Sequence, residues 1–284
     1  MSKLRDLKAR IDSVKKTKKM TQAMKMVSAA KFKRASDEIL KFRSYYNNFQ
    51  YLLESIKLHS DEANHHPLFF DNGVKKHLVI VLTGDRGLCG GFNTNVAKAA
   101  SEYCESLNSD DIEVICFGRK AAQLFKHKKW NVVSNHEGLQ HNSLKQVRQL
   151  IRPIRTRFLN KEVGKVTLFF TEFKSVASSH VSQINLLPII VDPCSSQGMQ
   201  DIIFEPEAAS LFSQLSTDYL YLSVYMSFLE SKAAEEGARM AAMDSATDNA
   251  KEMVGDLSLL YNRVRQAKIT TELSEIVAGA NALA

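Results

Sequence analysis

The chain has 284 residues, of which 44% are hydrophobic and 24% charged, as expected for a soluble protein of one or two domains. Only 12 residues are glycine and 5 are proline, which argues against collagen-like chains, turn-rich β-sandwiches and low-complexity disorder. The four cysteines stand too far apart for a CxxC pair. We therefore expect reduced thiols, with no disulfide framework and no zinc ribbon.

The net charge of +7 is unevenly distributed along the chain. Residues 1–43 carry 14 Lys or Arg against 4 Asp or Glu, a net charge of +10, so the remaining residues sum to −3. This basic arm predicts an acidic partner surface, which could be nucleic acid, anionic lipid or protein. We expect no membrane span, because the longest uncharged run, residues 176–191, is too short to cross a bilayer.

The N-terminal residues 4–56 repeat apolar side chains at a three–four spacing and contain no glycine or proline. This pattern predicts one long helix with a continuous apolar seam. Four consecutive seam positions between Lys18 and Ser28 are polar. An apolar alternative one residue earlier predicts a local stutter in the seam, through Met20, Met24 and Val27.

The C-terminal residues 215–271 show the same spacing and predict a second long helix. Gly237 and Gly255 lie inside this pattern, but each costs only about 1 kcal/mol relative to alanine. A separate domain joins the end of the first helix to the start of the second, so both helices extend away from that domain. We therefore expect them to form an antiparallel coiled coil. The C-terminal helix outlasts the other by about 15 residues, and its uncharged end, residues 276–284, predicts an enclosing partner.

The middle of the chain alternates strand-like and helix-like runs, which predicts a Rossmann-like α/β domain with a mostly parallel sheet. We expect three domains: an N-terminal coiled-coil helix at 1–60, the α/β domain at 74–205, and a C-terminal coiled-coil helix at 207–284. The strands are expected at residues 77–83, 113–117, 165–171 and 184–191, and the helices at 92–107, 118–128 and 142–159.

No segment of the chain carries a recognisable catalytic or cofactor motif. The glycine-rich run 84–91 lacks the spacing of a phosphate loop or of a dinucleotide fingerprint, so a tight strand-to-helix turn explains it better. His136 and His141 are five residues apart, which places them on different helix faces and not in a zinc-protease motif. We expect no cofactor, no metal and no catalytic residue.

Three segments carry a resemblance to a known family. They are RIxSVxxTxKMTxAMxMVSA at 10–29, DRGLCGGxN at 85–93, and ARMxAM at 238–243 with ATxNA at 246–250 and ITxELxEIVxGA at 269–280. In their order and spacing, these segments resemble the gamma subunit family of rotary F-type ATP synthases over essentially the whole chain.

The resemblance implies the central rotor shaft of a proton-translocating ATP synthase, a subunit that regulates ATP turnover and ion flow without catalysing either. Its coiled coil would lie within three alpha and three beta subunits, and its α/β domain and foot would bind the epsilon subunit and the membrane c-ring. Membrane association would come only through the complex, at the cytoplasmic face of the bacterial inner membrane. Contacts to the beta subunits are implied for Arg239, Arg265, Gln266, Thr270 and Glu272.

The resemblance also implies that Met24 lies at the contact with an acidic loop of a beta subunit, although an ordinary seam methionine explains this residue equally well. Two other classes of protein remain open from the residues themselves. A nucleic-acid-binding coiled coil would use the basic arm, although no nucleic-acid module is recognisable in residues 1–43. The second class is an α/β enzyme with a helical appendage, for which we would expect the isolated chain to bind nucleotide.

Overall fold

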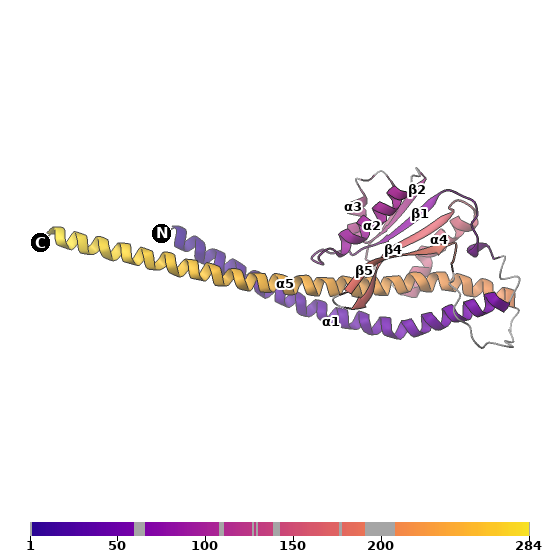
Figure 1. Cartoon of the computed structure of the whole chain (residues 1–284), viewed down its shortest axis with the longest axis horizontal. Helices are drawn as coiled ribbons and strands as arrows, with labels where there is room; N and C mark the ends of the chain where they lie inside the picture. Colours follow the sequence, from indigo (N-terminus) through magenta and orange to yellow (C-terminus); the bar gives the residue numbers. More distant parts are fainter. Residues whose placement is uncertain are drawn as a thin grey trace. The chain divides into compact units, whose positions relative to one another are not determined.

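A computed structural model describes residues 2–59, 66–107, 111–126, 128, 130–138, 143–175, 178–190 and 208–283. Two long helices, α1 (Ser2–His59) and α5 (Ala208–Leu283), are the first and last elements of the chain (Figure 1). The chain divides into two compact units, one formed by residues 1–29 and 239–284 and the other by residues 30–238. The three-domain division expected from the sequence stays a prediction.

The larger unit contains a five-stranded sheet whose strands follow the order β3-β2-β1-β4-β5. The strands β1 (His77–Leu82), β2 (Ile112–Phe117), β3 (Asn131–His136) and β4 (Lys165–Ser175) are parallel neighbours, and β5 (Ser178–Leu187) pairs antiparallel with β4. The central strand β1 reads HLVIVL and is buried on both faces, as parallel strands under two helical layers are. The predicted α/β fold with a mostly parallel sheet is confirmed.

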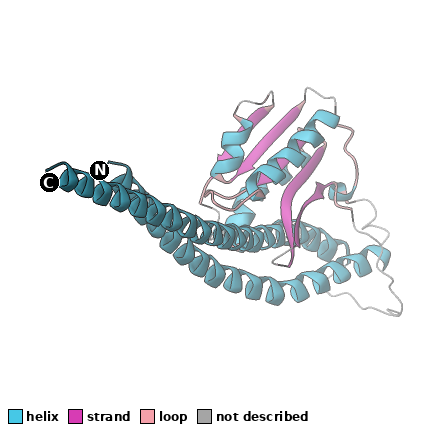
Figure 2. Cartoon of the chain, turned by 60° about the vertical axis from the view of Figure 1, so that its left-hand side comes forward, coloured by secondary structure: helices cyan, strands magenta, loops and turns pink. Residues whose placement is uncertain are grey.

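Helices cover both faces of this sheet within the same unit (Figure 2). On one face, Val79 and Val81 of β1 pack against α2 (Phe92–Ser106) and α3 (Arg119–Phe125). On the other face, Leu78 and Ile80 pack in one cluster with α4 (Leu144–Leu159) and residues 220–224 of α5. The alternation of β1 side chains therefore links two helical layers through one strand.

Two expectations about the sheet are wrong. The strand β3 was not expected at all, and its exposed side chains at Asn131, Val133 and Asn135 give it no apolar stripe. The last strand was expected at residues 184–191 but begins at Ser178 and ends at Leu187. Its first half is polar and extended because it continues the antiparallel ladder of β4, so an apolar pattern could not reveal it.

The two long helices are antiparallel in each unit, because residues with higher numbers on α1 contact residues with lower numbers on α5. In the larger unit, Lys232 pairs with Glu38 at 3.3 Å and Arg43 with Glu230 at 3.1 Å. In the smaller unit, the ammonium of Lys25 pairs with Asp244, and the hydroxyls of Thr21 and Thr247 lie 2.8 Å apart. The predicted antiparallel pair is confirmed.

The expected stutter in the α1 seam is wrong. Thr21 and Ser28 are buried in strict continuation of Leu7 and Ile11, whereas Met20 and Val27 are 64% and 56% exposed. Two of these polar residues, Thr21 and Lys25, have side-chain partners on α5, in Thr247 and Asp244. A satisfied hydroxyl at the helix interface removes the desolvation penalty that would otherwise favour an apolar alternative.

Candidate partner-binding surface

The far end of α5 is a helical surface that no described part of the chain covers. In the smaller unit, the seam positions of α5 are half-buried at Val254, Leu257, Tyr261, Val264 and Lys268. Beyond them, residues 269–278 are all exposed. We call residues 269–283 the overhang. The extension of α5 beyond its partner helix, expected from the sequence, is confirmed.

The overhang exposes large apolar side chains in a regular pattern. Ile269 is 47% exposed, Leu273 58%, Ile276 67% and Val277 58%. These positions follow a three–four spacing and so form a stripe along one side of the helix. A contiguous apolar stripe of this kind marks an interaction site rather than an ordinary solvated surface.

Four of the six predicted contact residues lie together just before and within this surface. Arg265, Gln266, Thr270 and Glu272 are all exposed on α5. The hydroxyl of Thr270 donates to the backbone oxygen of Gln266 at 3.0 Å, one helical turn away, so these two residues share a face. Glu272 pairs with Lys268 at 3.4 Å on the helix surface. The contacts of these residues to beta subunits stay a prediction.

The other two predicted contact residues are elsewhere in the smaller unit. Met24 is half-buried beside Lys25, and Arg239 is only 6% exposed. Arg239 therefore does not lie on a solvated helix face, where charged residues are usually found. Either residue can reach a partner only through the few atoms that remain exposed.

The glycine-rich loop between β1 and α2 is a turn whose polar groups are used internally. The carboxylate of Asp85 accepts from the backbone N–H groups of Arg119 and Gly138, each at 2.9 Å. The side chain of Asn93 accepts from Gly84 N at 2.8 Å and donates to Arg86 O at 3.2 Å. These bonds hold the ends of neighbouring strands and helices together. They explain the glycine-rich motif as part of the fold.

Burial shifts the pKa values of two cysteines and a histidine in the larger unit. Burial raises the pKa of the Cys104 thiol to about 12 and that of Cys116 to about 11, so both stay protonated at neutral pH. Burial lowers the pKa of His136, whose ring stacks on Phe117 at a centroid distance of 5.0 Å. The second histidine of that sequence pattern, His141, lies outside the described residues.

The described residues contain no group of three or more His, Cys, Asp or Glu placed to hold a metal ion. Within the same residues, none of the helices is both long enough and apolar enough to cross a membrane.

Buried acidic residues on α5 were missed by sequence reasoning. Glu230, Glu235 and Glu236 are 7%, 4% and 5% exposed in the larger unit, where α5 contacts both α1 and the sheet. Burial raises the pKa of Glu230, while the nearby guanidinium of Arg43 opposes this shift. The available signal was the basic arm on α1, which supplies partners such as Arg43 for carboxylates on the opposite helix.

Comparison with known proteins places this arrangement in a family. The family model described as ATP synthase matches residues 3–283. The ATP synthase gamma chain of Prosthecochloris aestuarii is 39% identical over 289 residues, covering 100% of this chain and 99% of the relative. The gamma chain of Heliobacterium modesticaldum is 38% identical over 292 residues, covering 100% of both chains.

Solved structures share the fold at lower identity. A chain of the Euglena gracilis mitochondrial ATP synthase in rotational state 3 has a TM-score of 0.68 and 18% identity, covering 99% of this chain and 95% of that one. A chain of the Tetrahymena thermophila central stalk and c-ring structure has a TM-score of 0.62 and 22% identity, covering 80% and 99%. Within the larger unit, the fold is thus an α/β layer packed on an antiparallel helix pair. The chain belongs to the ATP synthase gamma-chain family.

Proposed function

We propose that this chain is the central rotor shaft of a rotary F-type ATP synthase, coupling ion flow through a membrane c-ring to ATP synthesis and hydrolysis. In this proposal, three alpha and three beta subunits surround the helix pair, and the α/β layer and foot bind the epsilon subunit and the c-ring. The complex lies at the cytoplasmic face of the bacterial inner membrane. The observation that carries the proposal is the exposed apolar overhang of α5.

The overhang supports an enclosed position because exposed apolar area is costly when it stays in water. Burial of one large apolar side chain contributes about 1.5–3 kcal/mol, so the four residues of the stripe favour a surrounding sleeve of protein. Such contacts are also non-directional. A shaft held by apolar contact can turn inside its sleeve without breaking a fixed set of hydrogen bonds at each step.

Polar residues next to the overhang would give the shaft its angular preference. We assign beta-subunit contacts to Arg265, Gln266, Thr270 and Glu272, whose side chains are exposed before and within the overhang. A hydrogen bond to a charged group contributes about 1.5–3 kcal/mol, enough to favour one rotary position over the next. Met24 and Arg239 contribute through their smaller exposed parts.

The proposal assigns ATP chemistry to the surrounding subunits and a regulatory, mechanical part to this chain. It is supported by the loop 84–91, whose polar groups are used in turns, and by thiols that stay protonated. The shaft acts on turnover because an asymmetric surface holds the three beta subunits in different states. The basic arm on α1 supports an acidic loop as one of its neighbours.

Purification of the assembled complex tests the proposal. A complex isolated from membranes through a tagged beta-type subunit should contain one copy of this chain for every three beta subunits, with alpha and epsilon subunits present. The complex should hydrolyse ATP and the isolated chain should not. Recovery of this chain with RNA or DNA and without those subunits would contradict the proposal in favour of a nucleic-acid-binding protein.

A further inference from the structure

The helix α4 carries a row of basic side chains along one side. Its apolar stripe is buried against the sheet and comprises Val147, Ile151, Ile154 and Phe158. Beside that stripe, cations recur at a three–four–three spacing, which keeps them on one side of the helix. We call these residues the basic row: Lys145, Arg148, Arg152 and Arg155. Between Ser143 and Lys161 the sequence has no acidic residue.

Most of the charge of the basic row is not neutralised by described residues. Arg148 pairs with Asp218 at 2.8 Å and lies over the ring of Tyr221. Lys145 and Arg152 are exposed and make no ion pair with any described residue. The Nε atom of Arg155 is buried and finds no acceptor among the described residues. Lys145 and Arg152 therefore present positive charge at the surface that no described residue neutralises.

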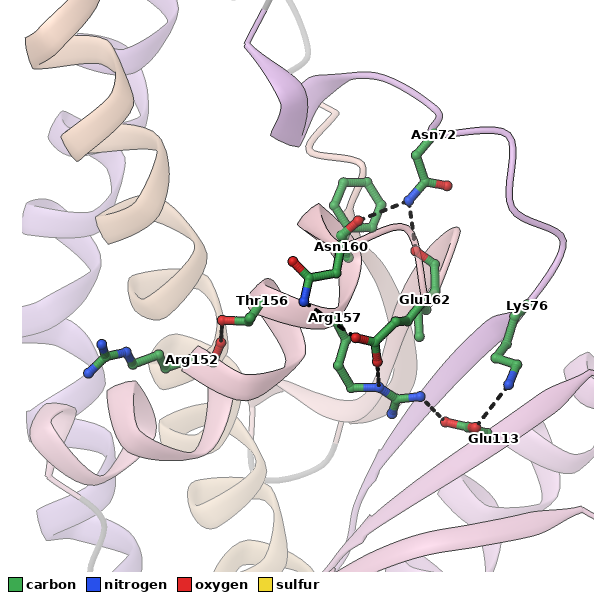
Figure 3. A network of polar contacts seen from close by, with 10 residues as sticks. Asn72, Lys76, Glu113, Arg152, Thr156, Arg157, Asn160 and Glu162 are labelled. Atoms are coloured by element: carbon green, nitrogen blue, oxygen red, sulfur yellow. Dashed lines mark hydrogen bonds and ion pairs between the residues drawn. The ribbon is translucent and has the colours of Figure 1, made fainter.

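The opposite side of α4 behaves differently, which separates the row from a structural network. There, Arg157 binds Glu113 at 2.6 Å and Glu162 at 3.3 Å. Figure 3 shows Arg157 directed toward these carboxylates, while the side chain of Arg152 points away from them. Arg157 is thus consumed in holding the α/β layer together, whereas Arg152 is available for an external ligand.

Burial and the Arg155 cation also act on a neighbouring side chain. Burial, followed by the charge of Arg155, lowers the pKa of His66. His66 bonds to Ser213 of α5 at 3.3 Å through its ring nitrogen. The positive potential of the row therefore extends beyond α4 to the residues packed beside it.

We propose that the basic row is a docking surface for the anionic phospholipid headgroups of a membrane. This inference rests on the proposed function, which places the chain beside a membrane. Guanidinium groups match the geometry of phosphate oxygens and bind them in pairs. An anionic lipid surface attracts clustered Lys and Arg through charge alone.

The surroundings of the basic row favour lipid over a protein or nucleic-acid partner. Apart from Leu159, the exposed residues of α4 are polar or proline, so the surface lacks the aromatic and apolar anchors that protein interfaces use. It equally lacks an exposed aromatic residue on which a base could stack. A fluid lipid surface also has no fixed angular position, so this attraction would hold a rotor foot near the membrane without stopping its rotation.

Partitioning of the whole chain onto vesicles tests the inference. The wild-type chain should bind vesicles of phosphatidylcholine with phosphatidylglycerol at low salt and should not bind phosphatidylcholine alone. The double variant Lys145→Gln/Arg152→Gln should bind about thirtyfold more weakly, because each cation near an anionic surface contributes about 1 kcal/mol. Both side chains are exposed, so thermal unfolding should be unchanged.

Charge-matched variants make the test specific. Lys98→Gln/Lys126→Gln removes the same charge from α2 and the end of α3 and should weaken binding less than about threefold, because only the net charge changes. Lys8→Gln/Lys15→Gln removes the same charge from the basic arm and should likewise weaken vesicle binding less than about threefold. Equal binding by the α4 and α2/α3 variants would overturn the inference, as would a loss confined to the basic-arm variant.

Polyglutamate serves as the probe for an acidic protein partner. If the α4 variant lost polyglutamate binding but kept vesicle binding, the lipid assignment would be overturned. The vesicle measurement uses the chain alone, so its failure leaves the subunit stoichiometry of the purified complex untouched. Failure of that stoichiometry would instead contradict the proposed function.

Discussion

At the scale of single residues, Glu113 holds several segments of the α/β layer together. Its carboxylate accepts from Lys76, which precedes β1, at 3.3 Å, and from Arg157 of α4 at 2.6 Å. Asn72 reinforces the same region by donating to the backbone oxygens of Phe158 and Val163. Burial alone would raise the pKa of Glu113, but the two cations outweigh it and the pKa is lowered.

Removal of the Glu113 charge should make stability less dependent on pH. A lowered pKa means that the carboxylate stabilises the fold fully above its ordinary value of 4.5, and that this contribution is lost as the pH falls through the folded value. Glu113→Gln should lower the free energy of unfolding by about 1.5–3 kcal/mol at neutral pH. Denaturant unfolding of both proteins should converge as the pH falls from about 5 to about 3.

A surface glutamate provides the control for this measurement. Glu102 is exposed and pairs with Lys98 one helical turn away at 3.7 Å. Glu102→Gln should change the free energy of unfolding by less than about 0.5 kcal/mol. Parallel loss of stability with falling pH in the wild type and in Glu113→Gln would contradict the assigned network.

Gly118, at the junction of β2 and α3, is a second position at which one residue decides stability. Its φ of +94° is unfavourable for a side chain, and an added Cβ would overlap the backbone oxygen of Thr83. Gly118→Ala should destabilise the chain by about 3 kcal/mol, from backbone strain and overpacking together. Thermal unfolding measures this.

Gly87 in the neighbouring loop is the matched control, because an added Cβ would have no heavy atom within 4 Å. Gly87→Ala should change stability by less than about 1 kcal/mol. Similar unfolding temperatures for the two alanine variants would show that the close approach at Gly118 is not what fixes this turn.

At the scale of elements, the sequence predicted the long helices well because their apolar seams run for many turns without a proline. The sequence also located β1, β2 and the start of β4, since buried parallel strands are almost entirely apolar. It missed β3 because an edge strand with alternating exposed positions has neither an apolar run nor a strong period.

The candidate site was predictable only where it depends on length or motif. The overhang follows from counting residues outward along two helices. The burial of Arg239 could not be predicted in this way. The position of a charged residue along α5 does not show which side chains cover it. The basic row was visible in the sequence of α4 as cations at three–four spacing, but only the structure shows which of them lack acidic neighbours.

The Thr21–Thr247 contact fixes how α1 and α5 meet in the smaller unit and can be measured directly. Thr21→Val should remove the contact of the Thr247 hydroxyl across the helix interface, leave only its bond to Met243 O in its own helix, and cost about 0.5–1 kcal/mol. Thr21→Val/Thr247→Val should be close to wild type, because two apolar side chains of the same shape then meet. The coupling free energy from the double-mutant cycle should reach at least about 0.5 kcal/mol.

Thr17 is the control for this cycle, because its hydroxyl donates only within its own helix, to Ser13 at 3.2 Å. Thr17→Val should leave helix unfolding, followed by circular dichroism, nearly unchanged. Additive effects of the two valine substitutions at Thr21 and Thr247 would mean that the hydroxyls do not act as a pair.

At the scale of the whole molecule, the chain combines a self-contained α/β unit with a helical unit that leaves part of its apolar surface uncovered. The α/β unit buries its apolar residues in clusters on both faces of its sheet. The overhang of α5 has no such cover among the described residues. The two units should therefore differ in what they need from partner subunits.

A charge placed on the overhang should separate assembly from folding. Val277→Asp introduces a carboxylate at a site that is 58% exposed in the chain, so the isolated protein should unfold as the wild type does. In the assembled complex, the same carboxylate would lose its hydration inside an apolar sleeve. We expect less of this chain per beta subunit in the purified complex and a lower temperature at which ATP hydrolysis is lost. Val133→Asp makes the same change at a 46% exposed position on β3 and should leave both quantities near wild type. Equal recovery and equal heat stability of the two aspartate variants would show that the overhang is not enclosed, and would remove the observation on which the proposed shaft function rests.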